Sequence, residues 1–445
     1  MFLRVTLWNF RSFDHIVFDL TDKAKKPKNF AIIYGENGSG KSNLVSAFVL
    51  LSELMQTMNI RDRVEELLGK TSVFNDEEMQ THFREQLISN MRDIKAIIDD
   101  YRMVDCVDPI CAEFEFGIGS NIGTYYVELG AEEIIREKLV YKLNQRRGVY
   151  FDCSPNSISI NSSIVKDKDL LSDIKAKAKR FWGKHSLLAI ISYEINDKSK
   201  AFGFENLSEN LFDVLLELDY VSSYIGIGNK EWESIFSPFP ILNHPINGKI
   251  PVEKENQLKI METVFSSFFS SIHSNIKELK YERHYHEKYI KYNLSVVRLI
   301  AGSYRTIDFD KESKGNHQLI KLLCYLFTSC FNETVVLDEA DSAIHDYLFR
   351  KIIQEIRPYI TGQIILTTHN TMLMEADLDR NFIYILSEDD AGRKSIQSIN
   401  DYDKRTYLAN NIRNRYLNNE YSGLPVVKEI DFKGLLKTLQ EMQES

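Results

Sequence analysis

The chain has 445 residues, of which 43% are hydrophobic and 27% are charged, and these fractions are typical of a globular protein with a large buried core. Its 64 acidic and 55 basic residues give a net charge of -9, which excludes a global positive field that would draw the whole surface onto nucleic acid. The 5 cysteines lack C-x-x-C spacing, which argues against a zinc site and a disulfide framework, and no apolar run is long enough to span a bilayer.

The N-terminal segment predicts two short strands around a polar turn, followed by a buried strand. Apolar and polar residues alternate at positions 2–7 and again at 16–20, and the polar stretch 9–12 separates the two runs. Positions 30–33 are all apolar. A short apolar run of this kind is typical of a strand that is covered on both faces.

The stretch that follows this strand matches G-x-x-x-x-G-K-[ST] and predicts a phosphate-binding loop between a strand and a helix. Its glycines let the backbone turn so that N–H groups face the phosphates. Lys41 is expected to reach the β- and γ-phosphates, and the Ser42 hydroxyl to ligate Mg²⁺. The expected ligands are therefore ATP and Mg²⁺. The residues predicted to bind the nucleotide are Gly35, Glu36, Asn37, Gly38, Ser39, Gly40, Lys41, Ser42 and Asn43.

The middle of the chain divides into three patterns. Residues 53–100 contain no proline and one glycine, which favours helices. Alternating apolar residues and glycine-containing turns predict antiparallel strands from 110 to about 160. The segment 165–300 reads as mainly helical, interrupted by proline-containing loops. Within it, the basic and aromatic run 175–184 is typical either of a solvated helix face or of a nucleic-acid contact.

Ser313 and Gly315 stand at the expected N-terminus of an apolar helix at 317–331. A hydroxyl, free backbone N–H groups and the positive end of the helix dipole can bind an anion at such a position. The same two residues are also typical of an ordinary helix cap.

Two further apolar strands end in polar side chains. The strand at 334–337 ends in Asp338 and Glu339, and two acids at the end of a buried strand are costly unless they serve a metal or a nucleotide. We expect Asp338 to hold Mg²⁺ and Glu339 to orient or deprotonate an attacking water. The strand at 363–367 leads to His369, a candidate catalytic residue.

The order of these motifs resembles that of ABC-type ATPases of the SMC, RecF and OLD-like class. In that class a phosphate loop, a signature, a Walker B strand, a D-loop and a switch histidine follow one another along the chain. The resemblance covers roughly residues 1–160 and 290–425, with a D-loop at 341–345. It implies an α/β fold, an ABC-type ATPase head with a mixed sheet and flanking helices.

The resemblance also assigns roles to individual residues. Arg11 matches an arginine that lies near the nucleotide, so it becomes a candidate phosphate or base contact. Ser313 and Gly315 match the signature, which in this class caps a γ-phosphate held by the phosphate loop of another subunit. His369 matches the switch histidine that senses the γ-phosphate. A homodimer or a larger homo-oligomer with shared ATP sites follows from these assignments.

The match departs from the family pattern in two places. Lys314 and Asn316 are unusual in a signature. No glutamine can be assigned to a Q-loop, because Gln56, Gln80 and Gln86 all fall in helical patterns. Both departures leave the rate of hydrolysis open.

The predicted organisation is an ATPase head made of residues 1–164 and 301–445, with 165–300 as a mainly helical insertion. The class includes ATPase subunits of phage-defence pairs, whose partners are TOPRIM-type or RloB-type nucleases. Too few residues follow His369 for a TOPRIM domain, so a nuclease would be a separate chain. The expected protein is thus a cytoplasmic ATPase with an effector partner and a phage-protein trigger. The alternative is a RecF-like DNA-repair ATPase, which would bind nucleic acid directly.

Overall fold

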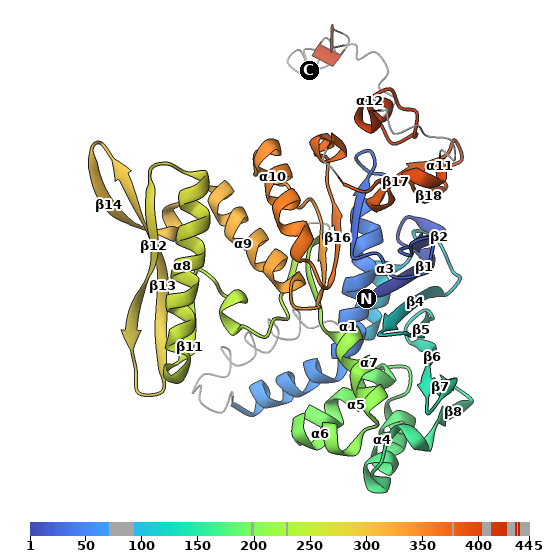
Figure 1. The fold of residues 1–445 in the computed structure, drawn as a ribbon. Helices are drawn as coiled ribbons and strands as arrows, with labels where there is room; N and C mark the ends of the chain where they lie inside the picture. The colour runs from blue at the N-terminus through green and yellow to red at the C-terminus, as the bar shows by residue number, and fades with distance from the viewer. Residues whose placement is uncertain are drawn as a thin grey trace, which may run out of the picture.

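The computed structural model describes residues 1–70, 93–196, 200–227, 230–375, 378–402, 411–424, 432–433 and 435–436. Two seven-stranded sheets and one four-stranded sheet form its framework, and helices lie between and around them (Figure 1). The α/β fold class expected from the sequence is confirmed, with a mixed sheet and flanking helices.

The central sheet carries the strand that precedes the phosphate loop. Its strand order is β10-β9-β15-β16-β3-β17-β18, with five parallel inner strands and an antiparallel strand at each edge. Its strands are β3 (Phe30–Tyr34), β9 (Val221–Ile227), β10 (Lys230–Ser234), β15 (Thr334–Leu337), β16 (Gln363–Thr367), β17 (Ile383–Glu388) and β18 (Lys394–Ser398). Every residue of β3 is buried, as expected for a parallel strand covered on both faces.

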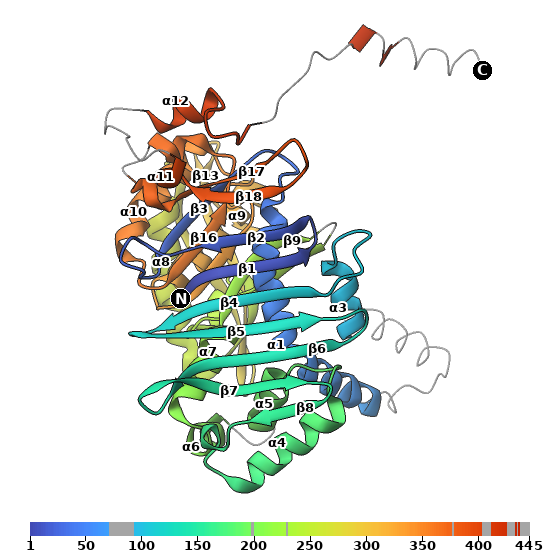
Figure 2. The same ribbon diagram turned by 90° about the vertical axis from the view of Figure 1, so that its right-hand side faces the viewer.

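The second sheet is antiparallel throughout and has the order β2-β1-β4-β5-β6-β7-β8 (Figure 2). Its strands are β1 (Phe2–Phe10), β2 (Phe13–Asp19), β4 (Ile110–Ile118), β5 (Asn121–Leu129), β6 (Ile134–Leu143), β7 (Arg146–Ser154) and β8 (Ser157–Ile160). Alternate residues of β4 and β5 are buried, because one face packs on the core and the other faces solvent. The predicted antiparallel layer and its end near residue 160 are confirmed.

The third sheet stands apart from the other two and is covered on one face by α8 (Figure 1). Its order is β11-β13-β12, and β14 also pairs with β13. Its elements are β11 (Asn247–Pro251), α8 (Glu255–Ile272), β12 (Ile276–Tyr285), β13 (Tyr289–Ile300) and β14 (Ser303–Asp308).

The remaining helices flank the two large sheets. They are α1 (Lys41–Lys70), α3 (Ile94–Tyr101), α4 (Lys168–Phe181), α5 (Leu187–Asn196), α6 (Lys200–Asn206), α7 (Glu209–Asp219), α9 (Lys314–Ser329), α10 (Asp346–Ile356), α11 (Ile399–Tyr402) and α12 (Ile412–Leu417). Among the helices of the described residues, none has the length and hydrophobicity needed to cross a membrane.

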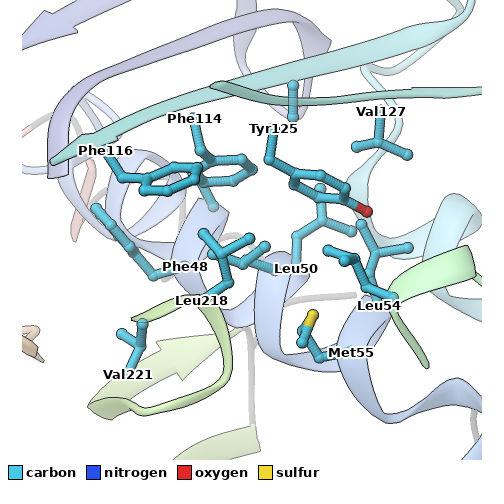
Figure 3. Packing of buried hydrophobic residues seen from close by; sticks show 14 of the residues in the cluster. Phe48, Leu50, Leu54, Met55, Phe114, Phe116, Tyr125, Val127, Leu218 and Val221 are labelled. Atoms are coloured by element: carbon cyan, nitrogen blue, oxygen red, sulfur yellow. The ribbon is translucent and has the colours of Figure 1, made fainter. Parts of the chain in front are cut away.

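Two hydrophobic cores meet at β3. Ala31 and Ile33 point into a core shared with α1 and the antiparallel sheet, whereas Phe30, Ile32 and Tyr34 point into a core shared with α8, α9 and α10. Figure 3 shows how α1 fills the first core, with Phe114 and Tyr125 of the antiparallel sheet on one side and Leu218 and Val221 on the other. The helix that begins at the phosphate loop is therefore buried between two sheets.

A buried amide ties the two large sheets together. The side chain of Gln363, the first residue of β16, donates to the carbonyl oxygens of Phe2 at 2.9 Å and Lys28 at 2.8 Å. Its Oε1 accepts from the Phe2 N–H at 2.8 Å. One fully buried side chain thus links strands β1 and β16 with the residues that lead into β3.

The prediction that 165–300 is mainly helical is correct for α4 to α8 and wrong for the strands from β9 to β13. β9 joins the central sheet beside β15, although Ser222 and Ser223 break its apolar pattern. Both serines are buried because their hydroxyls bond to chain around β10: Ser222 Oγ accepts from the Phe236 N–H at 2.8 Å, and Ser223 Oγ lies 3.1 Å from Ser234 Oγ. The division into an ATPase head at 1–164 and 301–445 and an insertion at 165–300 stays a prediction.

Candidate nucleotide-binding site

Three parallel strands bring the predicted motifs to one edge of the central sheet. The phosphate loop follows β3, Asp338 follows β15, and His369 lies two residues beyond β16. Because β15 pairs with β16 and β16 pairs with β3, all three run in the same direction and end at the same edge. Ligands of open α/β sheets bind at the carboxyl ends of the strands.

The glycines of the phosphate loop hold a conformation that other residues rarely adopt. Gly38 and Gly40 have φ of +85° and +106°, in the left-handed region that favours glycine. A Cβ at Gly35 would lie 2.6 Å from the Leu386 carbonyl oxygen of β17, so the loop packs directly on that strand. Ser39 Oγ is buried and has no hydrogen-bond partner in the described part of the chain, so it is free to bond a ligand.

Lys41 lies inside the loop, where the sequence predicts it. Its Nζ donates to the carbonyl oxygens of Gly35 at 2.9 Å and Glu36 at 3.0 Å. Burial lowers the pKa of Lys41, while the charges of Asp338 and Glu339 oppose this effect. A buried ammonium group next to two acids is a favourable place for phosphate oxygens and a divalent cation.

The Ser42 hydroxyl lies close enough to Asp338 to affect its pKa, so the two predicted metal ligands are neighbours. Thr367 Oγ1 also donates to Asp338 Oδ1 at 2.6 Å. Burial raises the pKa of Asp338, whereas the hydrogen bonds from Thr367 and Ser42 lower it. No group of three His, Cys, Asp or Glu side chains within the described ranges could hold a metal alone. This donor set suits Mg²⁺, which prefers oxygen ligands and keeps several waters and phosphates in its coordination shell.

Glu339 is held in an unusual backbone conformation at the end of β15. Its φ is +46°, and its backbone N–H donates to Thr367 Oγ1 at 2.8 Å. Its side chain is exposed, in contrast to the buried Asp338. Left-handed backbone at a residue other than glycine is strained and gathers at functional sites. The geometry is compatible with the predicted base, an exposed carboxylate adjacent to the buried metal ligand.

His369 and Asp341 interact electrostatically at the same edge of the sheet. Partial desolvation and the charge of Lys41 lower the pKa of His369, while Asp341 and other acids of the site oppose this. Burial raises the pKa of Asp341, and a hydrogen bond from Thr368 counteracts the rise. A lowered pKa favours a neutral imidazole, which can form a hydrogen bond to phosphate as donor.

Arg11 lies against the start of the phosphate-loop helix. Its Nη1 donates to Asn43 Oδ1 at 3.4 Å, and its guanidinium lies 4.7 Å from the centre of the Tyr101 ring. The neighbouring Ser12 accepts from Asn43 Nδ2 at 2.8 Å, and a Cβ at Gly40 would lie 3.0 Å from Ser12 Oγ. The turn between β1 and β2 is therefore packed onto the loop, and a contact between Arg11 and the nucleotide stays a prediction.

The structure gives Ser313 the role of a helix cap. Its Oγ accepts from the Asn316 N–H at 3.3 Å at the start of α9, which is one of the two alternatives left by the sequence. A Cβ at Gly315 would lie 2.9 Å from the Ala343 carbonyl oxygen, so this turn touches the D-loop of the same chain. The predicted contact of Ser313 and Gly315 with a nucleotide held by another subunit stays a prediction.

Two residues at the site carry no local sequence signal. Thr367 bonds both Asp338 and the backbone of Glu339, yet a threonine in a strand is common. Lys394 of β18 donates from Nζ to the Gly38 carbonyl oxygen at 3.1 Å, a contact that joins residues from opposite ends of the chain. The Q-loop stays unassigned.

The structure describes one of the three Q-loop candidates. Gln56 is half-buried on α1, and Gln80 and Gln86 lie outside the described residues.

Comparisons with known proteins give a family and two similar solved structures. The family described as "AAA domain, putative AbiEii toxin, Type IV TA system" matches residues 30–375. No curated protein matches the chain. Among solved structures, the SMC head domain from Thermotoga maritima is 16% identical, with 89% of this chain and 98% of that chain covered and a TM-score of 0.36. The Smc head domain of Pyrococcus furiosus bound to the C-terminal domain of ScpA is 14% identical, with 89% and 96% covered and a TM-score of 0.41.

Proposed function

Because the chain belongs to the AAA-domain family whose description names a putative AbiEii toxin and a type IV toxin–antitoxin system, we propose that it is the ATPase subunit of a phage-defence system. In this proposal the protein binds and hydrolyses ATP with Mg²⁺ in the cytoplasm and acts as a sensor or scaffold. It controls a partner effector, a nuclease of the TOPRIM or RloB type encoded nearby. A phage protein is the proposed trigger.

One observation carries the ATPase part of the proposal. Lys41 lies inside a glycine loop, Ser42 is a neighbour of Asp338, and Thr367 Oγ1 donates to Asp338 Oδ1 at 2.6 Å. These residues come from segments separated by about 300 positions in sequence. A structural core does not require a buried lysine and a buried acid at the end of parallel strands, because burying charge costs free energy. ATP and Mg²⁺ would compensate both charges.

Each polar side chain of the site has a proposed role in hydrolysis. The backbone N–H groups of the loop and Lys41 bind the phosphates, and Ser42 and Asp338 hold the metal directly or through water. Mg²⁺ supplies charge neutralisation between the β- and γ-phosphates when bound. Glu339 orients the attacking water and takes its proton, and His369 donates a hydrogen bond on the γ-phosphate side.

A phage-infection assay tests the role in defence. Cells carry this gene alone, with its neighbouring gene, or with the neighbour and the variant Lys41→Ala. Protection is expected only when both genes and an intact Lys41 are present, because the proposal gives the toxic activity to the neighbour and its control to ATP binding at Lys41. Full protection by this chain alone would contradict the proposed effector partner.

A further inference from the structure

The central sheet ends at β10, whose outer edge is paired with no strand of the described residues. β10 pairs on its inner side with β9, from Lys230 opposite Ile227 to Ser234 opposite Ser223. The far edge of the sheet, β18, is approached by β2 of the antiparallel sheet (Figure 2). An open strand edge presents N–H and C=O groups that readily pair with another chain.

A hollow runs along this edge. A cavity of about 700 Å³ is lined by all residues from Glu231 to Phe236, together with Asn243 and His244. A second cavity of about 350 Å³ shares Glu233, Ile235, Asn243 and His244 with the first, so the two are continuous. We call this continuous hollow the β10 groove. Because it follows the strand instead of closing around one point, it suits an extended segment of polypeptide better than a compact ligand.

The β10 groove reaches the signature helix. Lys314 and His317, in the first turn of α9, line its second cavity together with Lys321. Lys314 is the residue between Ser313, which caps α9, and Gly315, which touches the D-loop. An occupant of the groove would therefore contact the turn that carries Ser313 and Gly315, next to the D-loop.

The strand carries acidic side chains in an alternating pattern. Glu231 and Glu233 are two positions apart, so they project from the same face of β10, and both are exposed. Glu233 pairs with Lys321 at 3.0 Å, whereas Glu231 has no ion-pair partner in the described part of the chain. Cross-strand neighbours of opposite charge stabilise a sheet. Lys321 neutralises Glu233, and Lys314 also lines the groove. Glu231 is therefore the acid that remains to be matched, by a basic residue opposite it on an added strand.

From the open edge, the groove and the unpaired charge of Glu231, we propose that β10 receives an extended segment of the partner effector, with a basic residue opposite Glu231, as an eighth strand of the central sheet. The inference rests on the proposed function for the existence of an effector, and it assigns the surface that binds it. The added strand takes its affinity from main-chain hydrogen bonds and its specificity from alternate side chains. Its far end lies on the first turn of α9, which makes binding sensitive to the state of the ATP site.

A phage-displayed library of random 12-residue peptides tests the proposal and serves as the probe in place of the effector itself. The full-length protein is the target, and the double variant Glu231→Lys/Glu233→Lys is used for counter-selection. Glu253→Lys/Glu355→Lys is the matched control, because it changes the net charge equally at exposed residues outside the groove. ATP affinity and thermal unfolding of each variant verify that the fold and the nucleotide site are intact.

The expected peptides are extended and share a basic residue that matches Glu231, and they bind the wild type and the control variant equally, but the groove variant at least tenfold more weakly. The peptide amides form two alternating sets, which point to opposite edges of an extended strand. N-methylation of the set that faces β10 should weaken binding at least tenfold, and N-methylation of the other set should not. Hydrogen exchange of residues 231–235 should slow when the peptide binds.

Several results would overturn the proposal while leaving the ATPase assignment untouched. They are the absence of enriched peptides, equal binding to the groove variant, indifference to N-methylation, and protection elsewhere in the chain. Protection in the free protein of those β10 amides that face away from β9 would also overturn it, because the outer edge would then be covered by another segment of the same chain.

Discussion

At the scale of single residues, Lys41 makes the most direct prediction. Replacement by alanine removes the only ammonium group that contacts the carbonyl oxygens of Gly35 and Glu36 within the described loop. Hydrogen bonds to charged groups contribute about 1.5–3 kcal/mol each, so loss of two phosphate contacts should weaken ATP binding by at least 100-fold, roughly estimated. Calorimetry with ATP measures the change, with the exposed Lys26→Ala as control. Wild-type affinity in a folded Lys41→Ala protein would show that the loop assignment is wrong.

A variant at Glu339 should separate ATP binding from ATP hydrolysis. Glu339→Gln keeps the size of the side chain and loses the base, so ATP affinity should persist while single-turnover hydrolysis slows by about 10²- to 10⁴-fold. ATP-bound dimers or larger assemblies should accumulate, and size-exclusion chromatography with light scattering detects them. An unchanged single-turnover rate would eliminate the proposed role of Glu339.

Replacement of Thr367 should change the pH dependence of ATP hydrolysis. Burial raises the pKa of Asp338, and the hydrogen bond from Thr367 opposes this rise. Thr367→Val should therefore raise that pKa further, so that Asp338 holds Mg²⁺ as a carboxylate only at higher pH. The acidic limb of the Mg²⁺-dependent ATPase profile should shift upward, and Thr367→Ser should restore it because the hydroxyl is kept. Identical profiles for the valine and serine variants would contradict the positioning role of Thr367.

Sequence motifs located most candidate residues of the site but not the contacts between them. Lys41, Ser42 and Asp338 carry a spacing or a strand context that is typical of phosphate and metal sites. Thr367 and Lys394 have no such spacing, and their role depends on which strands become neighbours. The motif also could not decide between cap and signature at Ser313, because both use a hydroxyl at a helix N-terminus.

At the scale of elements, α5 is anchored by a carboxyl group that should titrate near neutrality. Glu137 of β6 accepts from the backbone N–H of Leu187 at 2.6 Å and from Tyr125 Oη at 3.0 Å. Burial raises the pKa of Glu137 from 4.5 to about 7. Between these two pH values the folded state keeps a proton that the unfolded state loses, so stability should fall as pH rises through this window.

The difference in pKa corresponds to a loss of up to about 3 kcal/mol in unfolding free energy between pH 5 and pH 8. Glu137→Gln should remove much of this decline, because an amide does not titrate. Urea unfolding at the two pH values measures it, with the exposed Glu132→Gln as control. A decline of equal size in wild type and Glu137→Gln would contradict the assignment.

The elements that were predicted correctly differ in pattern from those that were missed. β3, β15 and β16 are continuous apolar runs, and β4 and β5 alternate regularly, so local periodicity was sufficient. β9 and β10 are short and contain serines or glutamates at positions that bond to each other or line a groove. Their place in the central sheet is fixed by pairing with β15, more than 100 residues later, and no local pattern records that.

At the scale of the whole molecule, the main prediction is a site shared between two copies. In the composite arrangement, the turn at Ser313 of one copy completes the nucleotide site at Lys41 of the other. Mixing equal amounts of inactive Lys41→Ala and inactive Ser313→Arg should restore about a quarter of the wild-type rate, because half the dimers are mixed and each has one intact site.

A matched control separates shared chemistry from loss of a helix cap. Ser208 caps α7 as Ser313 caps α9, accepting from the Leu211 N–H at 3.3 Å, and it lies away from the signature. Ser208→Arg should therefore stay active on its own. Absence of complementation, with mixed dimers verified by differently tagged chains, would place a complete site within one copy.

The position of β3 between β16 and β17 also has a consequence for biosynthesis. Both neighbours of this strand are translated more than 300 residues after it. At about 5–20 residues per second, the ribosome needs roughly 20 to 60 s to supply them, while the antiparallel sheet is already complete in the emerged chain. The phosphate loop therefore gains its support on β17 only after residues 383–388 have left the ribosome. A nascent chain that stops before β17 should bind no nucleotide, so ATP binding cannot assist the early steps of folding.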